Sequence, residues 1–183
     1  MSARRAATWG ALAVMLGGPL AAAASAKSGA RLEGSFAMRG TLTFVDNIRG
    51  EYRGEHVNRM WTFLPHCASG ACARVTLLRR RSGRHVPDSV LLRRRGPGLY
   101  RGNGRFWVPL LCAGRVIRHG GLAFEKITVR VTRTVHVGAD RLVTGVRAVY
   151  DNPSRVNRTR CPGGIGRDAA RYTGTRVTPL PTA

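Results

Sequence analysis

The segment FEKITVRVTRTVHVG, residues 124–138, alternates apolar and polar side chains over more than ten positions. Ile127, Val129 and Val131 occur at every second residue, with polar side chains between them. A period of two places successive side chains on opposite faces of the backbone, which is the geometry of a β-strand. A Gly-Ala-Asp turn and a second β-rich run follow, so residues 125–150 are predicted to form a hairpin.

Seven further segments share this strand character, and glycine, proline, asparagine and aspartate separate them at fairly regular spacing. The eight segments are residues 35–46, 55–66, 72–80, 89–95, 99–111, 124–138, 141–152 and 170–178. This pattern predicts an all-β domain, a single antiparallel β-barrel of about eight strands, with a β-sandwich as the alternative. No segment after residue 26 indicates a helix. Residues 151–170 are predicted to be irregular.

The N-terminus has the features of a secretory signal peptide. Arg4 and Arg5 precede an apolar run that ends in Ala24-Ser25-Ala26, a small-x-small cleavage pattern. We therefore expect residues 1–26 to be a signal peptide and residues 27–183 to be a secreted, extracytoplasmic domain. A domain of that size buries about 70% of the surface of its unfolded chain, which is enough for a core of its own.

Four cysteines follow the predicted cleavage site: Cys67, Cys72, Cys112 and Cys161. An even number of cysteines in an exported chain indicates disulfides, here two. The tight loop CASGAC favours Cys67 with Cys72, which leaves Cys112 with Cys161. Zinc is the alternative, with His66 as a further ligand, but structural zinc sites use two closely spaced ligand pairs, and these cysteines form only one. We predict no metal and no cofactor.

The net charge is +22 for the whole chain, because 31 basic residues face only 9 acidic ones. All but Lys27 and Lys126 of the basic residues are arginines. Such a charge attracts anionic cell-envelope material, acidic polysaccharides and, without sequence selectivity, nucleic acid. A genome rich in G and C explains the choice of arginine over lysine, but it does not explain the scarcity of acids.

The stretch LLRRRSGRHVPDSVLLRRR, residues 77–95, contains the five-residue motif LLRRR twice. Its six arginines are the candidate anion-binding residues: Arg79, Arg80, Arg81, Arg93, Arg94 and Arg95. A hairpin centred on residue 85 would place Arg79 opposite Leu91. The two triads would then lie at opposite ends of the hairpin, on two basic rims of the barrel where even inward-pointing arginines reach water. Two separate rims suit a polymer better than one small anion.

Catalytic motifs are absent from the sequence: there is no nucleophile elbow, no H-E-x-x-H helix and no phosphate-binding P-loop. Glu51 and Glu55 are the only acids close in sequence, and on one strand face they would be about 13 Å apart, farther than the carboxyl pairs of glycosidases. We therefore predict no catalytic residue. Trp61 and Trp107 are expected to fill the core of so small a domain.

The segment RMWTFLPHCASGACARVTLLRR, the later LYRGNGRF, the turn at Cys112 and the late Cys161 together resemble small exported β-domain proteins of high-GC Gram-positive bacteria. These proteins, whose function is uncharacterised, carry a W-T-F-x-P-x-C-x4-C signature. The resemblance implies an extracytoplasmic location and disulfides, and a shape similar to lipocalin-like barrels. The G-x-W opening of true lipocalins is missing near Gly34.

Together these features predict a non-catalytic binding domain whose arginine-rich exterior holds it to an anionic polymer or to the cell envelope. The first alternative is a lipocalin-like carrier of a small apolar ligand, which requires an internal cavity. The second alternative is an enzyme assembled from dispersed residues, which requires two titratable groups converging in one pocket.

Overall fold

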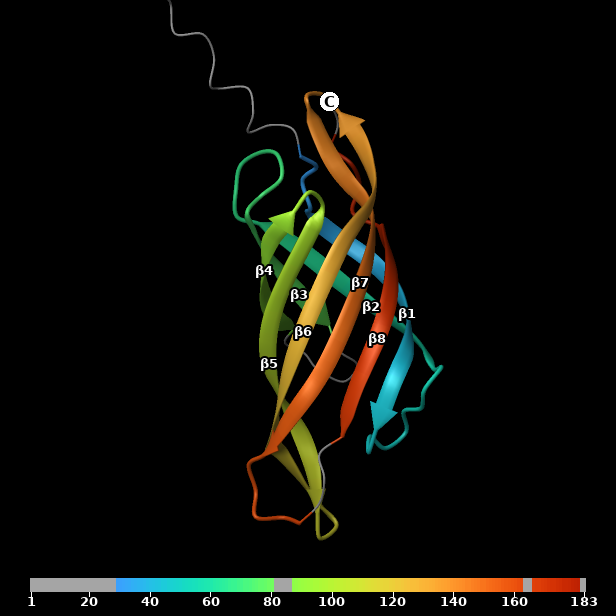
Figure 1. Ribbon diagram of the computed structural model, residues 1–183, viewed down its shortest axis with the longest axis vertical. Helices are drawn as coiled ribbons and strands as arrows, with labels where there is room; N and C mark the ends of the chain where they lie inside the picture. The colour runs from blue at the N-terminus through green and yellow to red at the C-terminus, as the bar shows by residue number, and fades with distance from the viewer. Residues whose placement is uncertain (1–28, 81–86, 163–165, 182–183) are drawn as a thin grey trace, which may run out of the picture.

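Eight antiparallel strands form a closed barrel in the computed structural model, which describes residues 29–80, 87–162 and 166–181 (Figure 1). They are β1 (Gly34–Asp46), β2 (His56–Pro65), β3 (Arg74–Arg80), β4 (Asp88–Gly96), β5 (Leu99–Cys112), β6 (Arg115–Val137), β7 (Asp140–Asn157) and β8 (Arg167–Arg176). Each strand pairs with the next in the chain, and β8 pairs with β1. The predicted all-β barrel is confirmed. The predicted signal peptide lies outside the described residues.

The alternation of side chains builds the core inside the ring of strands. On β3, for example, Val75 and Leu77 point inward and are buried, whereas Arg74 and Arg80 are exposed. Inward side chains from all eight strands fill the interior in this way, as expected for a barrel of this strand number. The largest of them is Trp61, which confirms its predicted place in the core.

Trp107 was predicted to lie in the core as well, and this prediction is wrong. Its side chain is 39% exposed on the outer face of β5, where its ring centroid lies 5.5 Å from that of His119. The neighbouring Phe106 and Val108 point inward instead. Because adjacent residues of a strand face opposite sides, those two residues and Trp107 cannot all be buried.

Close approach of the backbone to an aromatic ring occurs at Gly40 on β1. The ring of Tyr172 on β8 lies across Gly40, and a Cβ atom at this position would overlap the ring. The absence of a side chain allows Tyr172 to reach the interior, where its ring centroid lies 5.2 Å from that of Trp61. This contact joins β8 to β2 across β1, where the barrel closes.

Two long hairpins extend beyond the body of the barrel. The β5–β6 hairpin projects at the lower end of the view in Figure 1, and the β6–β7 hairpin projects at the upper end. Strand β6 begins at Arg115, well before the predicted residue 124, and β7 continues to Asn157 through part of the segment predicted to be irregular. Pairing with neighbouring strands, rather than local alternation of side chains, determines the additional length of these strands.

Both predicted disulfides are present. Cys67 pairs with Cys72 in the β2–β3 loop at the upper end, and Cys112 pairs with Cys161 at the lower end. The second bond joins the tip of the β5–β6 hairpin to the connection between β7 and β8. With all four sulfurs in disulfides, no thiolate remains for the alternative zinc site. Within the described residues, no helix has the length and apolarity needed to cross a bilayer.

Candidate functional site

The β3–β4 hairpin has a different register from the one expected from the sequence. Arg79 lies opposite Asp88, and Arg74 lies opposite Arg93. The expected partner of Arg79, Leu91, is three residues farther along the chain. The observed register places Leu77 opposite Val90, so that both side chains face inward. Since a shift by an odd number of residues moves a strand's apolar side chains to the other face, burial of these side chains decides between the two registers.

The described arginines of the two triads lie at opposite ends of this hairpin and do not form one site. Arg80 is exposed at the lower end, and Arg81 lies outside the described residues. Arg93, Arg94 and Arg95 are exposed at the upper end. Arg79 differs from all of these, because it points inward and is only 6% exposed. The expectation that it reaches water is wrong.

A polar network inside the lower end of the barrel holds Arg79. The guanidinium forms an ion pair and hydrogen bond with the Glu125 carboxylate, which is 2% exposed, and its Nη2 lies 3.9 Å from Oδ2 of Asp88. The same guanidinium lies 5.0 Å from the ring centroid of Tyr150 and 6.0 Å from that of Trp61. Arg79 is therefore bound within the protein and cannot serve as a surface anion site.

A second group of polar side chains in this end converges on Asp168, at the start of β8. Oδ1 of Asp168 accepts hydrogen bonds from Arg155 Nη2 at 2.8 Å, Asn152 Nδ2 at 3.0 Å and the Tyr150 hydroxyl at 3.3 Å. All three donors come from β7. Burial raises the pKa of the Tyr150 phenol, which therefore keeps its proton and remains a donor. Three donors therefore converge on one oxygen of the Asp168 carboxyl group, and the hydrogen bond from the Arg155 guanidinium is charge-assisted.

A pocket of about 370 Å³ opens between these groups and the β1–β2 loop. Its lining combines charged, aromatic and aliphatic side chains: Leu42, Ile48, Arg49, Glu51, Arg59, Trp61, Arg79, Arg80, Phe106, Val108, Pro109, Tyr150, Arg155, Asp168 and Tyr172. Burial raises the pKa of the Glu51 carboxyl, and the negative charges of Asp168 and Glu55 raise it further. The pocket is thus lined by two carboxyl groups from distant parts of the chain, and the raised pKa of the Glu51 carboxyl means that it retains its proton to higher pH than an ordinary glutamate.

The sequence did not predict that Glu51 and Asp168 line the same pocket, because the two residues are far apart along the chain. Glu51 and Glu55 were expected to lie on one strand, but the structure places both in the β1–β2 loop. The closure of β1 against β8 brings this loop beside the start of β8. Since closure is a property of the whole sheet, no local pattern around either acid indicates the pair.

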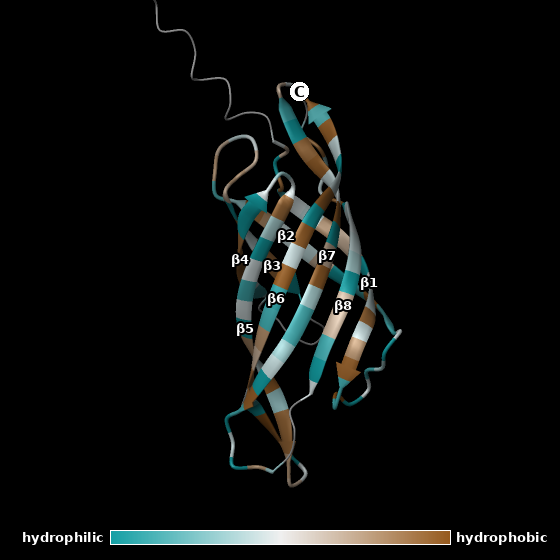
Figure 2. Cartoon of the chain, viewed as in Figure 1, coloured by the Kyte–Doolittle hydropathy of each residue, from teal (hydrophilic) through white to brown (hydrophobic). Residues whose placement is uncertain are grey.

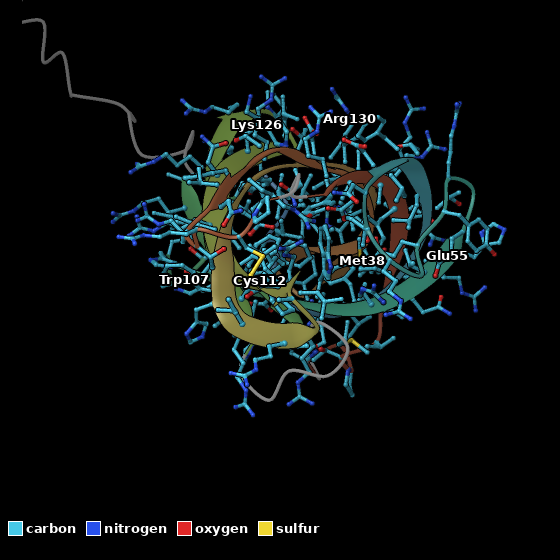
Figure 3. All side chains as sticks on the ribbon, turned by 90° about the horizontal axis from the view of Figure 1, so that it is seen from below. Met38, Glu55, Trp107, Cys112, Lys126 and Arg130 are labelled. Carbon is cyan, nitrogen blue, oxygen red and sulfur yellow. A yellow bond between two sulfur atoms is a disulfide. The ribbon has the colours of Figure 1, made fainter. Side chains whose placement is uncertain are left out.

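Several exposed arginines form rows on the outer face of the barrel. Arg130 on β6 lies directly opposite Arg147 on β7, and Arg93 on β4 lies opposite both Arg74 on β3 and Arg101 on β5. Figure 3 shows Arg130 on the outside of the ring of strands. We call the exposed arginines of these rows and of the adjoining β1 and β8 the arginine belt: Arg39, Arg74, Arg93, Arg101, Arg130, Arg147 and Arg171.

The belt borders a surface hollow of about 720 Å³ over β1, β2, β7 and β8. Arg39, Arg147 and Arg171 lie around it, together with His56 and Asn58. The described residues that line this hollow include no aspartate or glutamate, and none of its three arginines has a carboxylate partner within residues 29–80, 87–162 and 166–181. Three arginine side chains from three strands therefore border this hollow, and no described carboxylate neutralises their charge.

Only Arg93 of the belt was among the sequence candidates. The other belt arginines stand singly between apolar neighbours, at outward positions of their strands, and so form no cluster in the sequence. The period-two alternation indicates that each faces outward. Strand pairing alone places them side by side.

Comparison of the chain with protein-family models, with curated proteins and with solved structures finds no match in any of the three.

Proposed function

We propose that this protein is a secreted, disulfide-stabilised binding module that attaches to anionic cell-envelope or extracellular polymers through the arginine belt. The observation that carries the proposal is the placement of arginines directly opposite one another, at Arg130 with Arg147 and at Arg93 with both Arg74 and Arg101. Two disulfides are consistent with the oxidising exterior of a cell.

The opposed arginines lower the stability of the isolated barrel. Directly opposite side chains of an antiparallel pair have Cβ atoms about 5 Å apart, and like charges at that distance are destabilising. A polyanion relieves this repulsion, because its charges approach several arginines at once and release their counterions to the solvent. The belt gains more from such a partner than scattered surface arginines would.

The chemistry of the belt favours a partner recognised by charge rather than by base identity. Single-strand nucleic-acid sites usually interleave aromatic side chains with basic ones. Among its described lining residues, the hollow bordered by Arg39, Arg147 and Arg171 has no phenylalanine or tryptophan: Tyr172 is buried in the barrel, and the exposed imidazole of His56 is the remaining ring. Nucleic acid would therefore bind only as one more polyanion.

Retention on immobilised heparin or wall polymer, measured over a range of salt concentrations, tests the proposal. The double variant Arg147→Gln/Arg171→Gln should elute at lower salt, and the slope of log affinity against log salt should fall by roughly two. Arg53→Gln/Arg141→Gln removes the same charge from exposed positions outside the belt and is the matched control. Equal losses in the two variants would show that net charge, and not the belt, holds the polymer.

The pocket at the lower end supports a second candidate function, the binding of a small polar ligand. Glu51 Oε2, Arg79 Nε and Arg155 Nε are buried there with no hydrogen-bond partner in the part of the chain that the structure describes. This lining suits a polar ligand better than the apolar cargo of a lipocalin-like carrier. Glu51 and Asp168 are two titratable groups in one pocket, which is what the enzyme alternative requires. Isothermal titration calorimetry distinguishes a polar-ligand site from an apolar carrier. Small carboxylates and sugars should give heat of binding, and a medium-chain fatty alcohol should give none.

A further inference from the structure

A patch of apolar side chains lies on the outer surface of β5, β6 and β7, at the lower end of the barrel. Trp107 lies opposite Leu122, which in turn lies opposite Val156. Nearer the hairpin tip, Leu111 lies opposite Val116. Leu111 is 61% exposed and Val116 is 65% exposed. We call these five residues the apolar arm, and contiguous exposed surface of this kind marks an interaction site.

Arginines surround the apolar arm. Arg105, Arg115, Arg118 and Arg158 are all exposed on the same three strands or immediately after them. No aspartate or glutamate occurs in residues 105–124 or 152–162. The surface is therefore apolar in its centre and positively charged at its edge.

The β5–β6 hairpin, which carries four of the five residues of the apolar arm, projects from the barrel, and two features constrain its tip. Its two-residue turn places Ala113 and Gly114 at positive φ angles of 46° and 77°, the conformation of a tight hairpin turn. The disulfide between Cys112 and Cys161 ties the tip to the β7–β8 connection. The hairpin extends below the barrel in Figure 1, its lower part has hydrophobic colouring in Figure 2, and Trp107 points away from the ring of strands in Figure 3.

We propose that the apolar arm docks on the surface of an anionic lipid bilayer. Leu111 and Val116 insert among the acyl chains, and Trp107 lies at the depth of the headgroups, where tryptophan is enriched in membrane-bound proteins. The surrounding arginines bind lipid phosphates, with their aliphatic stems along the apolar surface. Apolar insertion and headgroup attraction together provide the two contributions that stable interfacial binding requires.

The charge at the edge of the arm favours a bilayer over a second copy of this chain. A two-fold dimer would bring the same patch of both copies together. Arg105, Arg118 and Arg158 of the two copies would then face one another without an acid between them. An anionic bilayer supplies the missing negative charge across the whole patch.

The proposal does not rest on the arginine belt, whose residues on β5, β6 and β7 are Arg101, Arg130 and Arg147 and lie closer to the β4–β5 turn than the apolar arm does. Vesicles of phosphatidylcholine and phosphatidylglycerol that carry brominated acyl chains provide the test, because bromine quenches an inserted tryptophan. The difference in fluorescence between the native chain and Trp107→Phe isolates Trp107 from the other tryptophans. We expect quenching and a blue shift of this difference signal with the mixed vesicles and much less with pure phosphatidylcholine.

The double variant Leu111→Ser/Val116→Ser should bind the mixed vesicles roughly tenfold more weakly, because it removes the inserted aliphatic groups and no charge. Leu64→Ser on β2 exchanges an exposed leucine of another face and should bind as the native chain does. Circular dichroism and thermal melting verify that each variant is folded. Absence of Trp107 quenching, or unchanged binding of the double variant, would overturn the proposal.

Polymer retention distinguishes this proposal from the proposed function. Leu111→Ser/Val116→Ser should elute from heparin at the salt concentration of the native chain, whereas Arg147→Gln/Arg171→Gln should retain the quenching of Trp107. Dimerisation through the arm would instead appear as a mass that rises with protein concentration and falls in Leu111→Ser/Val116→Ser, and this result would also overturn bilayer docking.

Discussion

Arg79 on β3 and Glu125 on β6 form a buried ion pair inside the barrel, although their strands are not neighbours in the sheet. The pair therefore crosses the interior and joins two walls of the barrel. Tyr150 and Trp61 lie against the guanidinium, and Asp88 lies nearby. The most prominent basic motif of the sequence thus contributes one of its arginines to the core and not to the surface.

Replacing one partner of this pair should destabilise the protein strongly. We expect Arg79→Gln to lower the free energy of unfolding by about 3–5 kcal/mol, because it removes a charged partner from the buried Glu125 carboxylate. Urea denaturation measures this change. Arg80→Gln, one residue along and exposed, is the control and should change stability by less than about 0.5 kcal/mol. Equal stabilities of the two variants would contradict the buried ion pair.

Removal of one belt arginine should stabilise the barrel while it weakens polymer binding. Arg147→Gln relieves the repulsion with Arg130 and should raise the free energy of unfolding by about 0.2–1 kcal/mol at low salt. Salt screens this repulsion, so the gain should diminish near 1 M NaCl. Arg171→Gln removes the same charge, but Arg171 lies opposite Thr41 and Val149, so its gain should be smaller.

The raised pKa of Glu51 predicts a pH-dependent effect of Glu51→Gln. A carboxyl whose pKa is higher in the folded state than in the unfolded chain contributes stability at low pH and loses it as the pH rises through the folded-state pKa. The variant cannot ionise and avoids that loss. Its stability relative to the native protein should therefore increase from about pH 4, the unfolded value, to neutral pH.

Denaturation with guanidinium chloride at pH 4 and pH 7.5 measures the effect of Glu51→Gln, with Glu55→Gln as the control in the same loop. A relative stability that is the same at both pH values would show that Glu51 is solvated like an ordinary surface carboxyl.

The two disulfides should contribute unequally to stability. In the chain-entropy model, the Cys112–Cys161 bond, which spans 49 residues, contributes about 4 kcal/mol, and the Cys67–Cys72 bond, which spans 5, contributes about 2 kcal/mol. Cys112→Ala/Cys161→Ala should therefore have the lower guanidinium midpoint of the two double variants. If Cys67→Ala/Cys72→Ala were the less stable variant, packing of the β2–β3 loop would outweigh chain entropy.

Local patterns predicted those parts of the fold that depend on neighbours in the chain. The alternation of Ile127, Val129 and Val131 indicates a strand whatever its partners are, and the loop CASGAC brings Cys67 to Cys72 without help from the rest of the fold. The register of Arg79 was predicted wrongly, because alternation defines the two faces of a strand but not which residue of the neighbouring strand lies opposite. Trp107 was placed on the wrong face, because burial of Phe106 and Val108 turns its side chain outward.

The sequence by itself determined the eight strands, the disulfide pairing and the excess of positive charge. Only the tertiary structure decided that β8 pairs with β1, that Arg79 meets Glu125 across the interior and that Arg130 lies opposite Arg147. The physical reason is that strand pairing brings residues far apart in the chain to within about 5 Å of each other, at positions set by burial of the whole inner face. The sites proposed for this protein arise from those non-local contacts.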